Sequence, residues 1–158
     1  MTPNPRIKPL ILIATLIACV FPISAVTLRP ASPNKDPNKV IIFVDITGYE
    51  QKRGPIYGAL YNNEDDFLND SKAIHKFTLR PETQKITINL PPLNKGDYAI
   101  TLYHDTNNNG KMDQNFIGIP KEPYAISNDA KGFFGPPKFK NAAISFHSSG
   151  QRIPLIFN

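Results

Sequence analysis

Cysteine is almost absent from this 158-residue chain: the only one, Cys19, lies in an apolar segment near the N-terminus. That segment has the features of an export signal, so the mature domain is expected to contain no cysteine. A disulfide framework, a thiol nucleophile and a cysteine-based zinc site are therefore excluded. An exported domain without disulfides must obtain its stability from core packing or from something such as a bound ion.

Histidine is scarce as well, and the common catalytic motifs are missing. His75, His104 and His147 are the only histidines, and they are scattered along the sequence. The chain contains no His-Glu-x-x-His, Gly-x-Ser-x-Gly or phosphate-loop pattern. A lone histidine without a suitably spaced partner is poor evidence for catalysis, so we expect a non-catalytic protein.

Clustered positive charge is also missing, although the formal net charge is +5. Arg6 and Lys8 fall in the expected signal, and their removal leaves +5 − 2 = +3. The remaining basic residues are spread singly, so we expect no nucleic-acid partner. No stretch has a helical period, and the 16 prolines favour short elements joined by stiff loops.

Residues 1–25 are typical of a signal peptide. Arg6 and Lys8 precede an apolar run over residues 10–21, which is too short to span a bilayer comfortably, and Ala25 offers a signal-peptidase site. We therefore expect a periplasmic or secreted protein, with a partner in the cell envelope or outside the cell and no transmembrane span in the mature chain. A second interpretation stays open, because Leu16-Ile17-Ala18-Cys19 resembles a bacterial lipobox and would place a lipid anchor on Cys19.

The rest of the chain predicts one strand-rich domain. Residues 26–39, rich in Pro, Asn, Lys and Ser, are expected to form a flexible linker before a single domain over residues 40–158. Residues 40–47 are mostly apolar and predict a strand buried on both faces. About seven strands predict an all-β fold, an antiparallel β-sandwich of Ig-like or transthyretin-like type. The expected strands are 40–47, 55–61, 75–80, 85–90, 98–102, 142–146 and 153–157.

Two local patterns predict how strands connect. Ser148-Ser149-Gly150, between the last two strands, predicts a β-hairpin. Tyr98 follows a leucine and a glycine at the start of a strand, which fits the tyrosine corner of β-sandwiches, where the phenol bonds back to the loop backbone. The same pattern fits a tyrosine that merely begins a strand.

Oxygen-bearing side chains recur at alternate positions after that strand. Calcium prefers a shell of oxygens, which loops of the EF-hand type supply from places one, three, five, seven and nine, with glycine at the sixth. The predicted metal ligands are Asp105, Asn107, Asn109, the carbonyl of Lys111, Asp113 and, from the next loop, Glu122, with Gly110 at the turn.

The predicted calcium shell is incomplete within its own loop. The twelfth place, normally a bidentate glutamate, is Phe116, so the missing carboxylate has to come from elsewhere. Glu122 and Asp129 in the next loop, or the pair Asp65 and Asp66, are candidates. The competing interpretation is a plain turn held by its own Asx hydrogen bonds.

Residues 116–139 form a connection longer than most loops in compact domains, and loops of this length are usually functional or disordered. Its apolar content, including Phe116, Ile119 and Phe139, predicts a long ordered loop that packs as a flap. Such a flap beside a metal site is a place to look for a ligand surface, and it is equally a cover for one end of the core.

The chain also carries a set of motifs in one half of its sequence: Tyr98-Ala99, His104 through Asp113, Gly118-Ile119-Pro120-Lys121-Glu122-Pro123-Tyr124, Ser127-Asn128, Phe134-Gly135-Pro136-Pro137 and Phe139. Together these motifs resemble a bacterial exported family catalogued as domain of unknown function 2141. The resemblance covers roughly residues 54–158 and implies a small exported β-sandwich with no established activity. At Ala125 the family usually has glycine. A shorter similarity connects residues 105–113 to calcium-bearing, transthyretin-like modules of bacterial surface proteins.

One catalytic alternative stays open. His104 and Asp105, with Glu122, form a metal-hydrolase centre if their side chains converge on one ion. The competing expectation places His104 in a strand, on the same face as Ile100 and Leu102, with its ring in the core.

Overall fold

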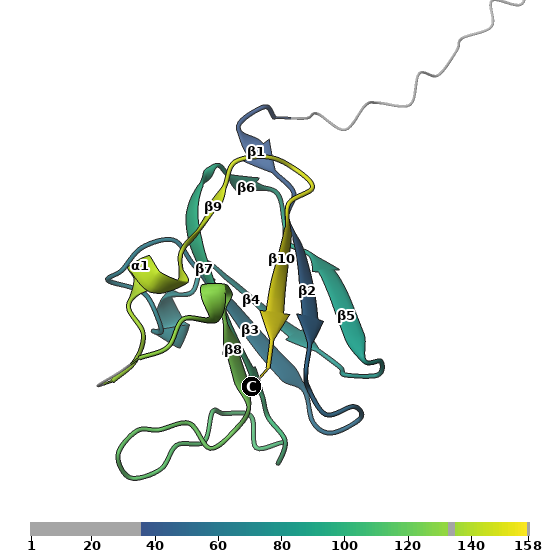
Figure 1. The fold of residues 1–158 in the computed structure, drawn as a ribbon, viewed down its shortest axis with the longest axis vertical. Helices are drawn as coiled ribbons and strands as arrows, with labels where there is room; N and C mark the ends of the chain where they lie inside the picture. Colours follow the sequence, from purple (N-terminus) through teal and green to yellow (C-terminus); the bar gives the residue numbers. More distant parts are fainter. Residues whose placement is uncertain (1–35, 133–134, 158) are drawn as a thin grey trace, which may run out of the picture. The chain divides into compact units, whose positions relative to one another are not determined.

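The computed structural model describes residues 36–132 and 135–157. The expected signal peptide (1–25), Cys19 and residues 26–35 of the expected linker lie outside these ranges, as do Phe133 and Phe134. The described part is mostly β (Figure 1), with strands β1 (Lys39–Val40), β2 (Phe43–Thr47), β3 (Ile56–Tyr61), β4 (His75–Leu79), β5 (Lys85–Asn89), β6 (Leu93–Asn94), β7 (Gly96–His104), β8 (Tyr124–Ile126), β9 (Ile144–Phe146) and β10 (Arg152–Ile156), 3-10 turns η1 (Asp70–Lys72) and η2 (Ser127–Asp129), and helix α1 (Phe139–Ala142).

The larger sheet has the strand order β4-β3-β7-β8, and all its pairings are antiparallel. β7 is its longest strand, and β9 pairs with the beginning of it. At the other end of β7, His104 pairs with Ile56 of β3. The loop that leaves β7 after His104 therefore starts beside the turn that enters β3.

The smaller sheet has the order β10-β2-β5. β2 pairs antiparallel with β5, but β10 runs parallel to β2, so the predicted antiparallel arrangement is wrong at this pairing. The predicted hairpin around Gly150 is also wrong, because β9 pairs with β7 in the larger sheet and β10 joins the smaller one. Gly150 instead donates its N–H to the carbonyl of Ile41, which ties the crossing segment to the start of β2.

One apolar core cluster takes side chains from both sheets. In β2 buried residues alternate with half-buried ones, so only one face is fully buried and the expectation of burial on both faces is wrong. The predicted strand over residues 40–47 is also interrupted between β1 and β2, where Ile41 is exposed. The fully buried members include Val44, Ile46, Leu155, Ile56, Leu60 and Ile100.

Tyr98 forms the predicted tyrosine corner. Its hydroxyl donates to the carbonyl of Asn94 over 2.9 Å, and its ring stacks on Phe146 with the centroids 4.8 Å apart. The phenol is 6% exposed, so the bond fixes the entry into β7 from within the core.

The long connection after residue 116 is only partly a packed flap. The middle of this connection forms β8, which joins the larger sheet. Ala125 of β8 is buried in the main core cluster. The expectation that Phe116 and Ile119 pack is wrong, because they are 98% and 54% exposed. Within the described ranges, no helix is long and apolar enough to cross a membrane.

Candidate functional site: a carboxylate clamp between two loops

The candidate loop begins at a position fixed by both neighbours of β7. The N–H of His104 donates to the carbonyl of Pro123 over 2.9 Å, and that of Asp105 to the carbonyl of Pro55 over 3.0 Å. Both side chains are fully buried. Gly54 has φ +62°, and an added Cβ would lie 1.8 Å from the carbonyl oxygen of Asp105, so only glycine permits this approach.

The carboxylate of Asp105 closes the turn that follows it. Oδ1 accepts the N–H of Asn109 at 3.0 Å, and Oδ2 accepts that of Gly110 at 2.7 Å. Gly110 has φ +80°, which glycine adopts without a side-chain penalty. A buried carboxylate is costly unless it is hydrogen-bonded, and these two charge-assisted bonds give each of its oxygens a partner.

Asn107, Asn109 and Asp113 meet on the outer side of the same turn. Both asparagine amides donate to Oδ2 of Asp113, at 2.6 and 2.9 Å. Their Oδ1 atoms accept backbone N–H groups two residues further on, from Asn109 and Lys111. Such Asx turns hold a loop without any ion.

Glu122 joins this turn to the next loop. Its Oε1 accepts the N–H of Thr106 at 3.0 Å and its Oε2 that of Asp113 at 3.3 Å, while the N–H of Lys121 donates to the carbonyl of Asp113 at 2.8 Å. The side chain is 6% exposed. We call the carboxylates of Asp105, Asp113 and Glu122, with the N–H groups they accept, the carboxylate clamp.

The structure brings five predicted side-chain ligands into one network, those of Asp105, Asn107, Asn109, Asp113 and Glu122. Lys111 contributes its N–H to this network. Within residues 36–132 and 135–157, no three His, Asp or Glu side chains are grouped closely enough to hold an ion. Both oxygens of Asp105 point at backbone N–H groups, and the two asparagines turn their amide nitrogens towards Asp113. An ion would require both amides to turn over, presenting oxygen instead.

The other acidic candidates lie elsewhere. Asp129 follows β8 at its end remote from the turn and pairs with Lys131 at 3.2 Å. Asp65 and Asp66 follow β3, whose last residue, Tyr61, lies opposite Ala99 and not opposite His104. The pairing of β7 with β3 and β8 therefore selects Glu122 as the acid beside the loop.

His104 points into the core. Its ring packs edge-on against Tyr49 and Phe157, with centroids 6.4 and 6.1 Å away, and its Nε2 bonds to the carbonyl of Arg53. That carbonyl only accepts, so Nε2 carries the hydrogen. Asp105 and Glu122 bond to backbone N–H groups. The three side chains of the proposed hydrolase centre therefore do not converge.

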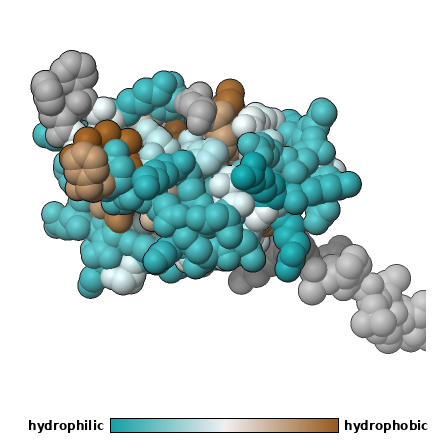
Figure 2. Space-filling view, turned by 90° about the horizontal axis from the view of Figure 1, so that it is seen from below, coloured by the Kyte–Doolittle hydropathy of each residue, from teal (hydrophilic) through white to brown (hydrophobic). Residues whose placement is uncertain are grey.

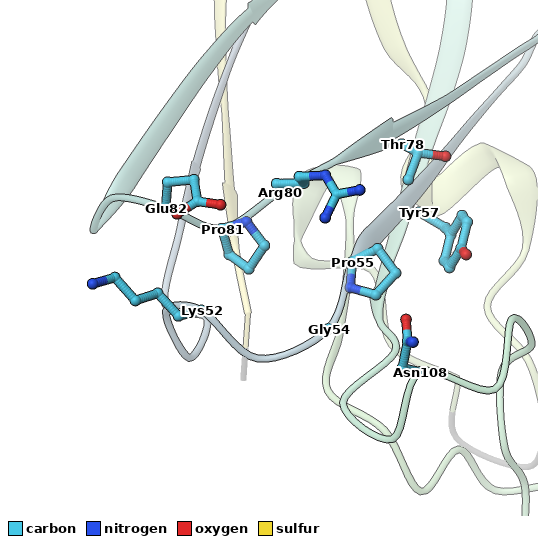
Figure 3. A pocket seen from close by; sticks show the side chains of 9 residues that line it. All are labelled: Lys52, Gly54, Pro55, Tyr57, Thr78, Arg80, Pro81, Glu82 and Asn108. Atoms are coloured by element: carbon cyan, nitrogen blue, oxygen red, sulfur yellow. The ribbon is translucent and has the colours of Figure 1, made fainter.

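A hollow of about 660 Å³ lies beside the clamp (Figure 3). It is lined by the turn before β3, the end of β4 and Asn108 of the clamp turn. Arg80 and Lys52 bring two exposed cations to its wall, and Tyr57 lies across from Arg80 in the close view. Its lining comes from three segments far apart in sequence, which is why no motif indicated it.

Two stacked tyrosines lie on the larger sheet, and one of them, Tyr57, lines the hollow. Tyr57 and Tyr103 face each other across the β3–β7 ladder and stack with centroids 5.1 Å apart. Burial, followed by the negative charges that Tyr57 and Asp105 can carry, raises the pKa of Tyr103 to about 12. The phenol is therefore neutral at physiological pH and serves as a packing group.

Comparison with known proteins identifies the family. The family described as "Uncharacterized protein conserved in bacteria (DUF2141)" matches residues 44–154, which include most of both sheets, the clamp and the hollow. Neither a search of the curated proteins nor one of the solved structures finds a match. Nothing in these comparisons supports the similarity to transthyretin-like modules. The family match spans most of the chain, so this protein belongs to the DUF2141 family of uncharacterised bacterial proteins.

Proposed function

We propose that this chain is an exported, non-catalytic β-sandwich module with a binding or structural role in the cell envelope or outside the cell. The observation that carries the proposal is the carboxylate clamp, which uses its acids to hold two loops together. The two larger of the three sheets in the described residues share one core, and this supports the sandwich. The N-terminal sequence pattern supports export.

The chemistry of the clamp supports a structural use of these acids. A general base or metal ligand directs its oxygens at a substrate or an ion, whereas these carboxylates direct theirs at backbone N–H groups. Glu122 and Asp105 each accept two backbone N–H bonds, one through each oxygen. Removing such an acceptor leaves buried N–H donors without a partner. These acids are therefore better suited to stabilising the fold than to catalysis or ion binding.

Calcium is a second candidate, favoured by the convergence of Asp105, Asn107, Asn109 and Asp113 at one turn. Rotation of the two amides would offer oxygens in place of nitrogens, with the Lys111 carbonyl and Glu122 close by. In this interpretation the ion strengthens the same junction that the hydrogen bonds already form.

Thermal unfolding of the wild type in calcium and in chelator tests both candidates. Calcium at a hundred times its dissociation constant should stabilise the fold by about 2.7 kcal/mol if it binds only the native state. Asp113→Asn should abolish that gain, whereas Asp65→Asn, an exposed acid remote from the turn, should retain it. Equal melting temperatures in calcium and chelator would reject the ion and leave the clamp, whereas a wild-type stability unaffected by Glu122→Gln would reject the clamp.

A further inference from the structure

The clamp presents a short loop whose apolar side chains face solvent. Phe116, Ile117 and Ile119 are 98%, 65% and 54% exposed. Figure 2, which views the molecule from below, shows a mostly hydrophilic face with apolar surface at its left edge and again near its top. Exposing three large apolar side chains in four residues is unfavourable in water and marks a surface that contacts something else. We call residues 114–120 the apolar tip.

The apolar tip is held in shape by its own hydrogen bonds. Oδ1 of Asn115 accepts the N–H groups of Ile117 and Ile119, at 3.0 and 2.9 Å, and the N–H of Asn115 donates to the carbonyl of Ile119. Gln114 and Pro120 form an isolated bridge at its base, next to the clamp. The loop is therefore a preformed projection, and little ordering entropy is lost when it is buried.

The fully exposed charged residues that flank the apolar tip in the sequence are lysines. Lys111 and Lys121 flank it and are exposed, whereas Asp105 and Glu122 are buried in the clamp and Asp113 is half-buried under two amides. The clamp thus buries the charges of Asp105 and Glu122, while the carboxylate of Asp113 stays partly exposed and accepts two amide N–H groups. A projecting apolar loop between lysines complements a lipid surface with anionic headgroups, where apolar side chains enter the interface and lysines meet phosphates.

We propose that the apolar tip inserts Phe116, Ile117 and Ile119 into an anionic lipid bilayer, with Lys111 and Lys121 against the headgroups. The proposal rests on the export part of the proposed function, which brings the chain to an envelope membrane. In this proposal, the carboxylate clamp holds the base of a loop that docks on a membrane.

Tryptophan fluorescence tests insertion at the apolar tip itself. The chain contains no tryptophan, so Phe116→Trp in the full chain supplies a single local fluorophore that reports insertion whatever the N-terminal segment does. Vesicles of phosphatidylglycerol and phosphatidylethanolamine should shift its emission to shorter wavelength, and phosphatidylcholine vesicles should shift it less. Ile74→Trp is the matched control, because Ile74 is 45% exposed and lies outside the apolar tip; its emission should not change.

Charge variants in the Phe116→Trp background test the lysines. Lys111→Gln and Lys121→Gln should each raise the lipid concentration at half-shift by about fivefold, as expected for a basic residue near an anionic surface. Lys95→Gln removes the same charge at the opposite end of β7, roughly 25–30 Å away along the strand, and should have no effect.

An unchanged Phe116→Trp emission, or an equal shift of both tryptophans, would overturn the proposal. A shift produced only by envelope protein extract would overturn it in favour of a protein partner. Melting temperature separates this result from the clamp, because Phe116 is 98% exposed and its substitution should not change stability, whereas Glu122→Gln should.

Discussion

At the scale of single residues, individual side chains hold the two loops of the clamp together. Glu122 is buried and reaches N–H groups at residues 106 and 113, so one side chain fixes both loops. The spacing of Asp105, Asn107, Asn109 and Asp113 predicted that they act together. It could not select Glu122 over other acids, because that choice depends on how distant strands pair.

Glu122→Gln should lower the free energy of unfolding by about 1–3 kcal/mol. The amide keeps one acceptor oxygen but loses the charge and the second acceptor, so a buried N–H is left without a partner. Urea denaturation measures the change. Glu64→Gln, at an exposed position, is the matched control and should stay within about 0.5 kcal/mol of the wild type.

Gly54→Ala should be more destabilising than an ordinary glycine substitution. Gly54 and Gly150 both have positive φ, but an added Cβ at Gly54 meets the Asp105 carbonyl, while nothing lies within 4 Å at Gly150. We expect Gly150→Ala to cost about 1–2 kcal/mol for the backbone conformation alone. Gly54→Ala should cost clearly more in the same urea titration, and equal costs would mean that the turn does not approach the clamp closely.

At the scale of elements, alternation predicted most strands but not their partners. β4 and β5 lie where the pattern placed them, because period-2 burial is a local property. The parallel pairing of β10 with β2 is decided by long-range contacts, which no local turn signal reveals. The same limit applies to Phe116, since apolar content does not show which apolar residues face solvent.

Asp45 joins the three strands of the smaller sheet and should make their association pH-dependent. Hydrogen bonds from Arg152 and then Thr87 lower its pKa from 3.8 to about 2. Arg152 approaches it at 2.6 and 2.9 Å and Thr87 at 2.6 Å, from the strands on either side of β2. Because the native pKa is depressed, this stabilisation is present above pH 3.8 and is lost as the pH falls towards 2.

Asp45→Asn should therefore flatten the acid limb of the stability profile. Urea midpoints measured from pH 5 down to about pH 2 should fall less steeply for the variant than for the wild type. Asp65→Asn, an exposed acid, should follow the wild-type slope. Parallel profiles for Asp45→Asn and the wild type would show that the Arg152 pair contributes nothing to stability.

At the scale of the whole molecule, the predicted export route determines where the apolar tip can act. Cleavage after Ala25 should leave Val26 as the first residue of the exported protein, as N-terminal sequencing would show. Cys19→Ser should leave that processing unchanged. Loss of processing in Cys19→Ser would instead favour the lipid-anchored interpretation, in which Cys19 begins the mature chain.

The family match and the strand-rich fold agree with the sequence, whereas the hollow beside Arg80 and the exposed apolar tip emerge only when distant segments are brought together. The junction of the two loops depends most on Glu122. Hydrogen exchange of individual backbone amides tests this directly. The amides of Thr106 and Asp113 should be protected in the wild type and should exchange about tenfold faster or more in Glu122→Gln, while Glu64→Gln leaves them unchanged. Exchange at these two amides that is unprotected in the wild type, or unaffected by Glu122→Gln, would contradict the clamp.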